Sequence, residues 1–498
     1  MESNLAQESP KTEALTTFQN FINGRWVSAT GGKTFRTKNP ADTRDVIGEF
    51  PSSPVEDVRS AIDAAHEALK DWRSLSAWAR GEYLRKAADL LESRLTEVAQ
   101  AMVRENGKTI TEARGESARG VALLRYYAAE GVRSVGEVIP SVNPKTFIYT
   151  ARVPLGVVSI ITPWNFPIAI PIWKIAPALV YGNTVVFKPA SATPHCAVLV
   201  TQILEKAGIP KGVVNLVMGG GGALGEELVR NEKVHGVSFT GSNSIGRRIA
   251  GWSADRGVKF QLEMGGKNPT LILADCDLEQ AATMTMRAAF GYAGQKCTAT
   301  SRAIILDSIY DQFVKRLLEL TGSLKVGKGS EETTFVPPVV SEDQQRSILG
   351  AIEKGKSDGK LLCGGGRPKG DGFQNGYYIE PTIFGDVNSN SQLAQEEIFG
   401  PVLALLRAKD LDHAIKLAND VRFGLSASIF TRDLNSVQEY VNRIEAGIVK
   451  VNSETAGVEP QVPFGGVKES SSHSREQGRA AMEFFTSVKT VYVDRAGL

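Results

Sequence analysis

Cysteine is scarce in this chain of 498 residues, and the four cysteines are not arranged in CxxC pairs. The scarcity argues against a disulfide framework and a structural zinc site, and it favours a reducing compartment. No group of His, Asp and Glu has the spacing of metal ligands, so we predict no metal site. Only five histidines occur, none in a recognisable nucleophile motif, which leaves a Cys-His hydrolase with weak support.

An excess of charge of one sign is also missing, because 57 basic and 55 acidic residues are interspersed and leave a formal net charge of +2. This balance favours neither nucleic-acid nor membrane binding. No window approaches the roughly 18 apolar residues of a membrane-spanning helix, and the N-terminus lacks the features of a secretion signal. We expect a cytoplasmic protein with a poorly ordered tail over residues 1–16. The length predicts two or three domains.

From Gly156 onward, short apolar segments alternate with segments of helical pattern. The predicted strands are 157–161, 184–187, 213–217, 237–240 and 260–262, and the predicted helices are 168–181, 194–206, 223–230 and 245–252. This alternation predicts an α/β fold with a doubly wound, mostly parallel sheet. Ligands bind at the carboxyl ends of the strands in such a sheet, so the residues that follow the strands should line one edge.

The flanking regions also carry local signals. Asn23-Gly24 predicts a hairpin turn, and Ser53, Pro54 and Glu56 predict a capped helix start. A single long amphipathic helix is expected from about Ala79 to Glu105. Further on, we expect helices over 278–290 and 309–324 and strands over 303–306, 448–452 and 487–493. A late strand such as the last one often pairs across a subunit or domain boundary.

One cysteine has neighbours suited to chemistry. Cys297 follows the predicted helix 278–290 and precedes the predicted strand 303–306, so it should lie on a short connection that faces a cleft. Gly294 offers little steric cover and Lys296 offers a cation, so the thiol could be held partly as the nucleophilic thiolate. Taken alone, however, this cysteine is better explained as buried and inert.

Three polar residues at the predicted sheet edge each have a functional and a plain interpretation. Glu263 precedes Met-Gly-Gly and could be a general base or a surface salt-bridge partner. Asn165 lies in the proline-flanked segment 163–167, and it could be an oxyanion donor or a turn residue. Lys188 ends an apolar strand and could bind a ribose or simply be solvated.

Two glycine-containing segments could bind phosphate. Segment 219–225 fits G-x-G-x-x-G between a strand and a helix, although no acidic residue follows at the expected distance. Segment 240–246 is the better anion site, because a strand ends there, Ser242 offers a hydroxyl and the amides of a new helix follow. The alternatives are a flexible loop and an ordinary helix cap.

Seven motifs, taken together and in order, resemble those of the NAD(P)-dependent aldehyde dehydrogenases. They are Pro163-Trp-Asn-Phe-Pro167, Lys188-Pro-Ala190, Phe239-Thr-Gly-Ser242, Leu262-Glu-Met-Gly-Gly-Lys267, Gly294-Gln-Lys-Cys297, Glu397-Ile-Phe-Gly-Pro401 and Pro463-Phe-Gly-Gly466. The resemblance runs from about Phe21 to Val493. It implies an NAD(P)-binding domain (17–130 and 152–262), a catalytic domain (263–477) and an oligomerisation flap (131–151 and 478–498). It also implies a homodimer or homotetramer that acts on a small-molecule aldehyde.

The resemblance implies a role for individual residues. Cys297 would attack the aldehyde carbon, Asn165 would hold the oxyanion and Glu263 would activate the water that hydrolyses the thioester. Lys188 joins this catalytic set and also binds a cofactor ribose. The further cofactor contacts are Thr162, Trp164, Ser191, Gly221, Gly225, Ser242, Glu397 and Phe399, and the substrate-pocket residues are Phe166, Trp173 and Phe464.

Cofactor choice is expected to depend on Ser191. Many NAD-specific members of the family have a glutamate there, whose charge repels a 2′-phosphate, whereas serine leaves room and a hydrogen bond. We therefore predict that NADP is accepted, with a preference for NADP or NAD left open.

For the substrate, segments 169–174, 290–302, 457–461 and 470–478 look closest to α-ketoglutaric semialdehyde (2,5-dioxopentanoate) dehydrogenases of sugar-acid catabolism. Succinate semialdehyde dehydrogenases are the alternative, but they carry carboxylate-binding arginines where this chain has Trp173 and Gly291. The stretch 470–475 is one residue longer than is usual in the family. A CoA-acylating relative, a cysteine hydrolase and a non-catalytic protein are the rival classes.

Overall fold

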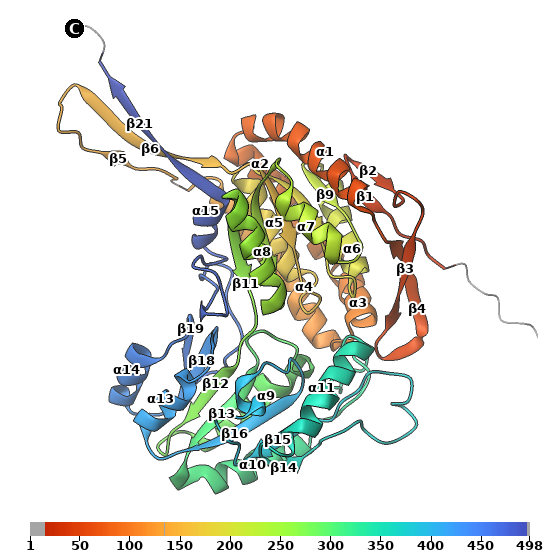
Figure 1. Ribbon diagram of the computed structural model, residues 1–498, viewed down its shortest axis with the longest axis vertical. Helices are drawn as coiled ribbons and strands as arrows, with labels where there is room; N and C mark the ends of the chain where they lie inside the picture. The colour runs from red at the N-terminus through yellow and green to blue at the C-terminus, as the bar shows by residue number, and fades with distance from the viewer. Residues whose placement is uncertain (1–14, 134, 496–498) are drawn as a thin grey trace, which may run out of the picture.

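The computed structural model describes residues 15–133 and 135–495, so most of the expected N-terminal tail lies outside the described residues. Two seven-stranded sheets form the two large bodies of the molecule, and a three-stranded sheet projects from one corner (Figure 1). Among the described helices, none is long and apolar enough to cross a membrane.

The first sheet has the order β11-β10-β7-β8-β9-β1-β2. Its strands are β11 (Lys259–Glu263), β10 (Val234–Thr240), β7 (Val157–Ile161), β8 (Thr184–Lys188), β9 (Val214–Leu216), β1 (Asn20–Ile22) and β2 (Arg25–Val27). The first five strands are parallel, and the predicted hairpin β1–β2 joins β9 in antiparallel fashion. Most residues of β10, β7, β8 and β9 are buried, as a sheet covered on both faces requires.

Helices cover both faces of this sheet. On one face, α1 (Val55–Ser74) contacts α7 (Gly222–Arg230), which contacts α8 (Asn243–Arg256). On the other face, α5 (Ala169–Val180) contacts α6 (Pro194–Lys206). The predicted doubly wound α/β arrangement is confirmed.

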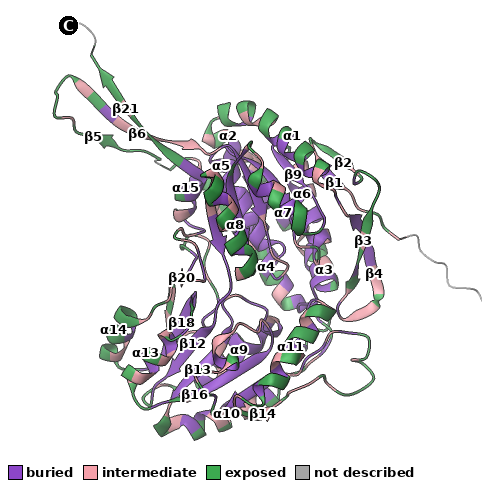
Figure 2. Ribbon diagram, viewed as in Figure 1, coloured by how far each residue is buried: buried purple, intermediate pink, exposed green. Residues whose placement is uncertain are grey.

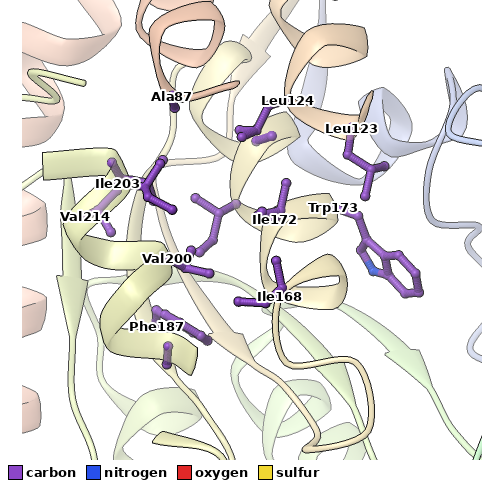
Figure 3. Packing of buried hydrophobic residues seen from close by; sticks show 14 of the residues in the cluster. Ala87, Leu123, Leu124, Ile168, Ile172, Trp173, Phe187, Val200, Ile203 and Val214 are labelled. Carbon is purple, nitrogen blue, oxygen red and sulfur yellow. The ribbon is translucent and has the colours of Figure 1, made fainter. Parts of the chain in front are cut away.

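Helix α5 lies at the centre of this body, and all of its residues are buried. Ile168, Ile172 and Trp173 at its start pack beside Leu123 and Leu124 of α4 (Ile110–Glu130) in the same apolar cluster (Figure 3). A helix that is apolar on all sides needs such cover.

Two of the local predictions were wrong. The expected single helix from Ala79 to Glu105 is two helices, α2 (Ala77–Ser93) and α3 (Leu95–Asn106), because Arg94 leaves the helical conformation with φ −112° and ψ 14°. The break lets α2 pack on α5 and α3 pack on α6. The expected Ser53 cap is also absent: Pro54 is the N-cap of α1, and the Ser53 hydroxyl instead accepts a hydrogen bond from Asn20.

The second sheet has the order β14-β15-β16-β13-β12-β18-β19. Its strands are β14 (Lys360–Cys363), β15 (Thr382–Gly385), β16 (Val402–Ala408), β13 (Thr300–Leu306), β12 (Asn268–Ile272), β18 (Ser426–Phe430) and β19 (Ile448–Val451). The helices of this part of the chain are α9 (Leu278–Phe290), α10 (Tyr310–Gly322), α11 (Glu342–Gly355), α12 (Gln392–Gln395), α13 (Leu411–Asn419) and α14 (Leu434–Arg443). Its central strands are buried, like those of the first sheet (Figure 2).

The projecting sheet joins two distant parts of the chain. It consists of β5 (Val138–Ile139), β6 (Thr146–Pro154) and β21 (Thr486–Asp494), and β21 pairs with β6 along its whole length. The late strand thus pairs with a strand from much earlier in the same chain. Several apolar side chains on this arm are exposed, among them Val138, Phe147, Val488 and Tyr492 (Figure 2).

The remaining elements are short or lie at the edges of the two bodies. They are β3 (Thr34–Asn39), β4 (Asp42–Pro51), β17 (Phe423–Gly424), β20 (Val467–Lys468), α15 (Ala480–Phe485), η1 (Gly291–Gly294) and η2 (Asp307–Ile309).

Candidate active site

Residues that follow the strands of the first sheet meet the cysteine loop at one cavity of about 210 Å³. Six of the predicted site residues line this cavity: Trp164, Asn165, Ser242, Cys297, Glu397 and Phe399. The other predicted cofactor and substrate residues lie outside its lining. The cavity therefore brings together side chains from both large sheets, which is where a site for two reactants would be expected.

Cys297 lies, as predicted, on the connection between α9 and β13. The turn before it is unusual, because Tyr292 and Ala293 have positive φ angles of 58° and 51°. The Cys297 carbonyl accepts a hydrogen bond of 2.7 Å from Asn268 Nδ2, which fixes the loop against β12. The backbone carbonyl of the nucleophile candidate is thus fixed by a side chain from the second sheet.

The surroundings of Cys297 do not favour the thiolate that its sequence neighbours suggested. Burial raises the pKa of Cys297 to about 12, and the nearby carboxyl groups of Glu397 and Glu263 raise it further. The Nζ of the neighbouring Lys296 lies 5.1 Å from the ring centre of Tyr292, and burial lowers the pKa of Lys296, while nearby acidic groups, Cys297 among them, raise it. Local sequence could not show this burial.

Asn165 is fixed by contacts on each of its sides. Its Nδ2 donates a hydrogen bond of 3.0 Å to the carbonyl of Gln295 in the cysteine loop, while its backbone carbonyl accepts one of 2.8 Å from Lys108. Lys108 forms a buried ion pair with Glu116, whose Oε1 accepts from the amides that begin α5. The amide donor is therefore preorganised beside the cysteine loop, as an oxyanion donor must be.

Glu263, at the end of β11, is held by a residue that sequence reasoning did not single out. Ser471 Oγ donates a hydrogen bond of 2.6 Å to Glu263 Oε2, while Glu263 Oε1 is buried without a partner among the described residues. Burial, and then the charge of Glu476, raises the pKa of Glu263 well above its usual value, and the Ser471 hydrogen bond opposes this rise. The one feature of the sequence that drew attention to this region was the extra residue in stretch 470–475.

The glycine at 465 is required by this arrangement. Its φ is +145°, and a Cβ there would lie 2.8 Å from Glu263 Oε1. A larger residue would therefore meet the carboxylate of Glu263.

Several groups around the strand ends suit a dinucleotide. Lys188 Nζ is buried and donates to the Pro189 carbonyl at 3.0 Å, and burial lowers the pKa of Lys188 to about 8. Thr240 Oγ1 is buried without a partner among the described residues. Ser242 is the N-cap residue of α8, but its hydroxyl accepts no hydrogen bond from the first backbone amides of that helix.

The glycine segment and Glu397 complete this side of the site. A Cβ at Gly221 or Gly225 would meet nothing within 4 Å, so the backbone is open to close approach. Glu397 Oε1 accepts a hydrogen bond of 2.9 Å from the Gly266 amide, and burial raises the pKa of Glu397 to about 7. The exposed Ser191 donates to the Gly219 carbonyl at 3.0 Å. Lys188 and Glu397 suit the hydroxyls of a ribose, and the helix starts that follow the glycine segment and Ser242 suit a pyrophosphate.

Aromatic side chains flank the other side of the cysteine loop. Phe166 lies 5.1 Å from Tyr292, and Trp173 lies 5.3 Å from Phe464, measured between ring centres. Trp173 Nε1 donates a hydrogen bond of 2.7 Å to Glu476, which also forms a buried ion pair with Lys174. Sequence reasoning gave no role to Lys174 or Glu476, because their pairing joins segments far apart in the chain.

Among the residues that the structure describes, no three His, Cys, Asp or Glu side chains are grouped so that they could hold a metal ion. Residues 26–491 match the model of the aldehyde dehydrogenase family. The chain therefore belongs to this family of NAD(P)-dependent enzymes, and the resemblance seen in its motifs is confirmed.

Named relatives agree with the family. The α-ketoglutaric semialdehyde dehydrogenase of Bacillus subtilis (strain 168) is 51% identical over 96% of this chain and 98% of that protein. The 2,5-dioxopentanoate dehydrogenase of Saccharolobus solfataricus is 44% identical over 94% and 98% of the two chains.

Solved structures show the same fold. The betaine aldehyde dehydrogenase of Staphylococcus aureus in complex with NAD+ has a TM-score of 0.94 and 32% identity, covering 97% of this chain and 96% of that one. An E. coli NADP dependent enzyme has a TM-score of 0.93 and 35% identity, covering 96% and 98% of the two chains. The aldehyde dehydrogenase fold is thus confirmed.

Proposed function

We propose that this enzyme oxidises 2,5-dioxopentanoate (α-ketoglutaric semialdehyde) to 2-oxoglutarate through a covalent intermediate on Cys297. The observation that carries the chemistry is the cavity shared by Cys297 and Asn165, which puts a nucleophile and an amide donor at one place. Support for the substrate comes from the names of the two relatives above.

The proposed steps use the side chains in sequence. Cys297 Sγ bonds to the aldehyde carbon and the thiol proton passes to water, while Asn165 Nδ2 and the Cys297 N–H donate to the oxyanion. When bound, NAD(P)+ supplies the hydride acceptor that lets the cysteine adduct become a thioester. Glu263 then takes a proton from the water that attacks the thioester carbon, and the sulfur leaves as the acid forms.

The first experiment measures cofactor reduction with a panel of three- to six-carbon semialdehydes. The proposal expects the highest kcat/KM with 2,5-dioxopentanoate. Faster turnover of succinate semialdehyde would favour the alternative substrate. No cofactor reduction with any aldehyde would leave a cysteine hydrolase or a non-catalytic protein.

We further propose that NADP is accepted. The support is the uncharged hydroxyl of Ser191, which stands beside the glycine segment without a carboxylate that would repel a 2′-phosphate. The match to an E. coli protein described as NADP dependent agrees with this. A hundredfold higher kcat/KM with NAD+ than with NADP+ would overturn the proposal.

The proposed division of the chain assigns 17–130 and 152–262 to cofactor binding, 263–477 to catalysis, and 131–151 with 478–498 to oligomerisation. The exposed apolar side chains of the three-stranded arm support the last assignment, because such a surface is stabilised by cover from another subunit. Light scattering should give the mass of a dimer or tetramer, and a monomer would contradict it. A cytoplasmic location stays a prediction.

A further inference from the structure

Arg119, on helix α4, occupies an unusual position among the arginines of that helix. Its guanidinium lies 6.0 Å from the ring centre of Trp173 and donates to the Val458 carbonyl and, at 2.9 Å, to Gln477 Oε1. Trp173 belongs to α5, and Val458 and Gln477 lie before and after Phe464 in the sequence. Arg119 is therefore directed toward the aromatic side of the candidate active site.

Arg119 lacks the direct ion pair that other arginines of α4 have, although the charges of Tyr292 and Glu116 act on it. Arg114 and Arg125 on the same helix are exposed and form ion pairs with Glu332 and Glu92. By contrast, Arg119 is half-buried and forms no ion pair within residues 15–133 and 135–495. A guanidinium has five N–H donors, and the two contacts above leave three of them for another acceptor.

Burial supports the same interpretation. Desolvation lowers the pKa of Arg119, which means that the cation is held at a cost in free energy. A carboxylate offsets such a cost well, because a planar guanidinium can bind both of its oxygens at once.

The aromatic residues near Arg119 connect it to the candidate active site. Trp173 lies beside Phe464 in a tilted arrangement, the next residue Gly465 lies against Glu263, and Tyr292 belongs to the loop of Cys297. Tyr292 is also among the groups that act electrostatically on Arg119. An extended five-carbon chain measures about 5 Å from its aldehyde carbon to its carboxyl carbon. A substrate of this size, with its aldehyde at Cys297, would bring its far end toward these aromatic residues.

We infer that Arg119 binds the carboxylate at the far end of the substrate and so selects ω-aldehyde acids over uncharged aldehydes. This inference rests on the proposed function for its substrate class. It also accounts for the absence of arginine at Trp173 and Gly291: the cation is supplied from α4, on the face of Trp173.

The test compares Arg119→Gln and Arg119→Lys with the wild type on two aldehydes of equal length, 2,5-dioxopentanoate and pentanal. We expect the ratio of kcat/KM for the acid over pentanal to fall roughly 30-fold or more in Arg119→Gln, chiefly through KM, because one partner of a buried charge pair is lost. Arg119→Lys should keep part of the preference. Arg125→Gln is the matched control, because Arg125 lies on the same helix and is exposed.

A second measurement separates this inference from the proposed substrate. Inhibition of pentanal oxidation by 2-oxoglutarate should weaken by a similar factor in Arg119→Gln, whether or not the wild type oxidises 2,5-dioxopentanoate. Weakened inhibition with no wild-type turnover of that semialdehyde would refute the substrate and support the role of Arg119. Equal losses on both aldehydes with unchanged inhibition would show that Arg119 only tethers the segments around Val458 and Gln477, and the inference would be overturned.

Discussion

Replacing Ser471 with alanine should slow the release of the acid product. The Ser471 hydroxyl accepts a hydrogen bond of 2.7 Å from the Gly466 amide, so its single proton is directed to Glu263. That hydrogen bond favours the ionised carboxylate, which is the form that can take a proton from water. Without it, the pKa of Glu263, already raised by burial, rises further.

The size of the effect follows from the type of bond. A buried hydrogen bond to a charged group contributes about 1.5–3 kcal/mol, which corresponds to roughly a 10- to 150-fold change in the ionised fraction when Glu263 is mostly protonated. Because the pKa is raised, the loss is largest at low pH. The rise of the deacylation rate with pH should therefore move to higher pH in Ser471→Ala.

Stopped-flow absorbance of the reduced cofactor measures this directly. The variant should show a burst of cofactor reduction followed by a slower steady state, and its kcat should approach that of the wild type as the pH increases. Ser471→Thr, which keeps a hydroxyl, should restore part of the rate, and Ser474→Ala is the matched control from the same stretch. An unchanged pH profile in Ser471→Ala would show that the serine does not act on the base.

Four further changes test other parts of the site. Cys297→Ser should abolish cofactor reduction and Glu263→Gln should stall at the acyl-enzyme after one turnover, so a normal steady state without a burst in Glu263→Gln would contradict the role of the base. Asn165→Ala should lower kcat about 10²- to 10³-fold through loss of one oxyanion donor, and a loss below threefold would place the oxyanion elsewhere. The rate at which iodoacetamide alkylates Cys297 can be followed by peptide mass spectrometry on the enzyme without cofactor. This rate should rise about tenfold per pH unit from pH 7 to 10, because thiolate forms only as the pH approaches a pKa of about 12. A plateau of the rate below pH 9 would contradict the raised pKa. Ser191→Glu should lower kcat/KM for NADP+ at least tenfold more than for NAD+, through repulsion of the 2′-phosphate, and equal effects on both cofactors would show that this position does not select between them.

Much of the fold followed from local pattern. The apolar strands after Gly156 predict a parallel sheet covered on both faces. Residues at the ends of these strands line the same cavity as the cysteine loop. The placement of Cys297 between a helix and a strand is equally local. What could not be predicted depends on contacts between distant segments, such as Ser471 with Glu263 and Lys174 with Glu476.

The wrong predictions have the same origin. The break at Arg94 is absent from the amphipathic pattern, which continues through it, and appears only in the fold, where α2 and α3 both pack on α4 and α6 and α2 also packs on α5. The raised pKa of Cys297 reflects desolvation inside the folded protein, whereas its small and polar neighbours indicate exposure. Local composition does not report how much of a loop the remaining chain covers.

The pairing of β21 with β6 has a consequence for how the protein is made. While the ribosome is still adding the second half of the chain, the long edge of β6 has no neighbouring strand from residues 486–494, and it offers nine residues for pairing with any extended chain nearby. The nascent protein must therefore carry an open edge for most of its synthesis, and premature termination near the end would leave that edge permanently available for aggregation.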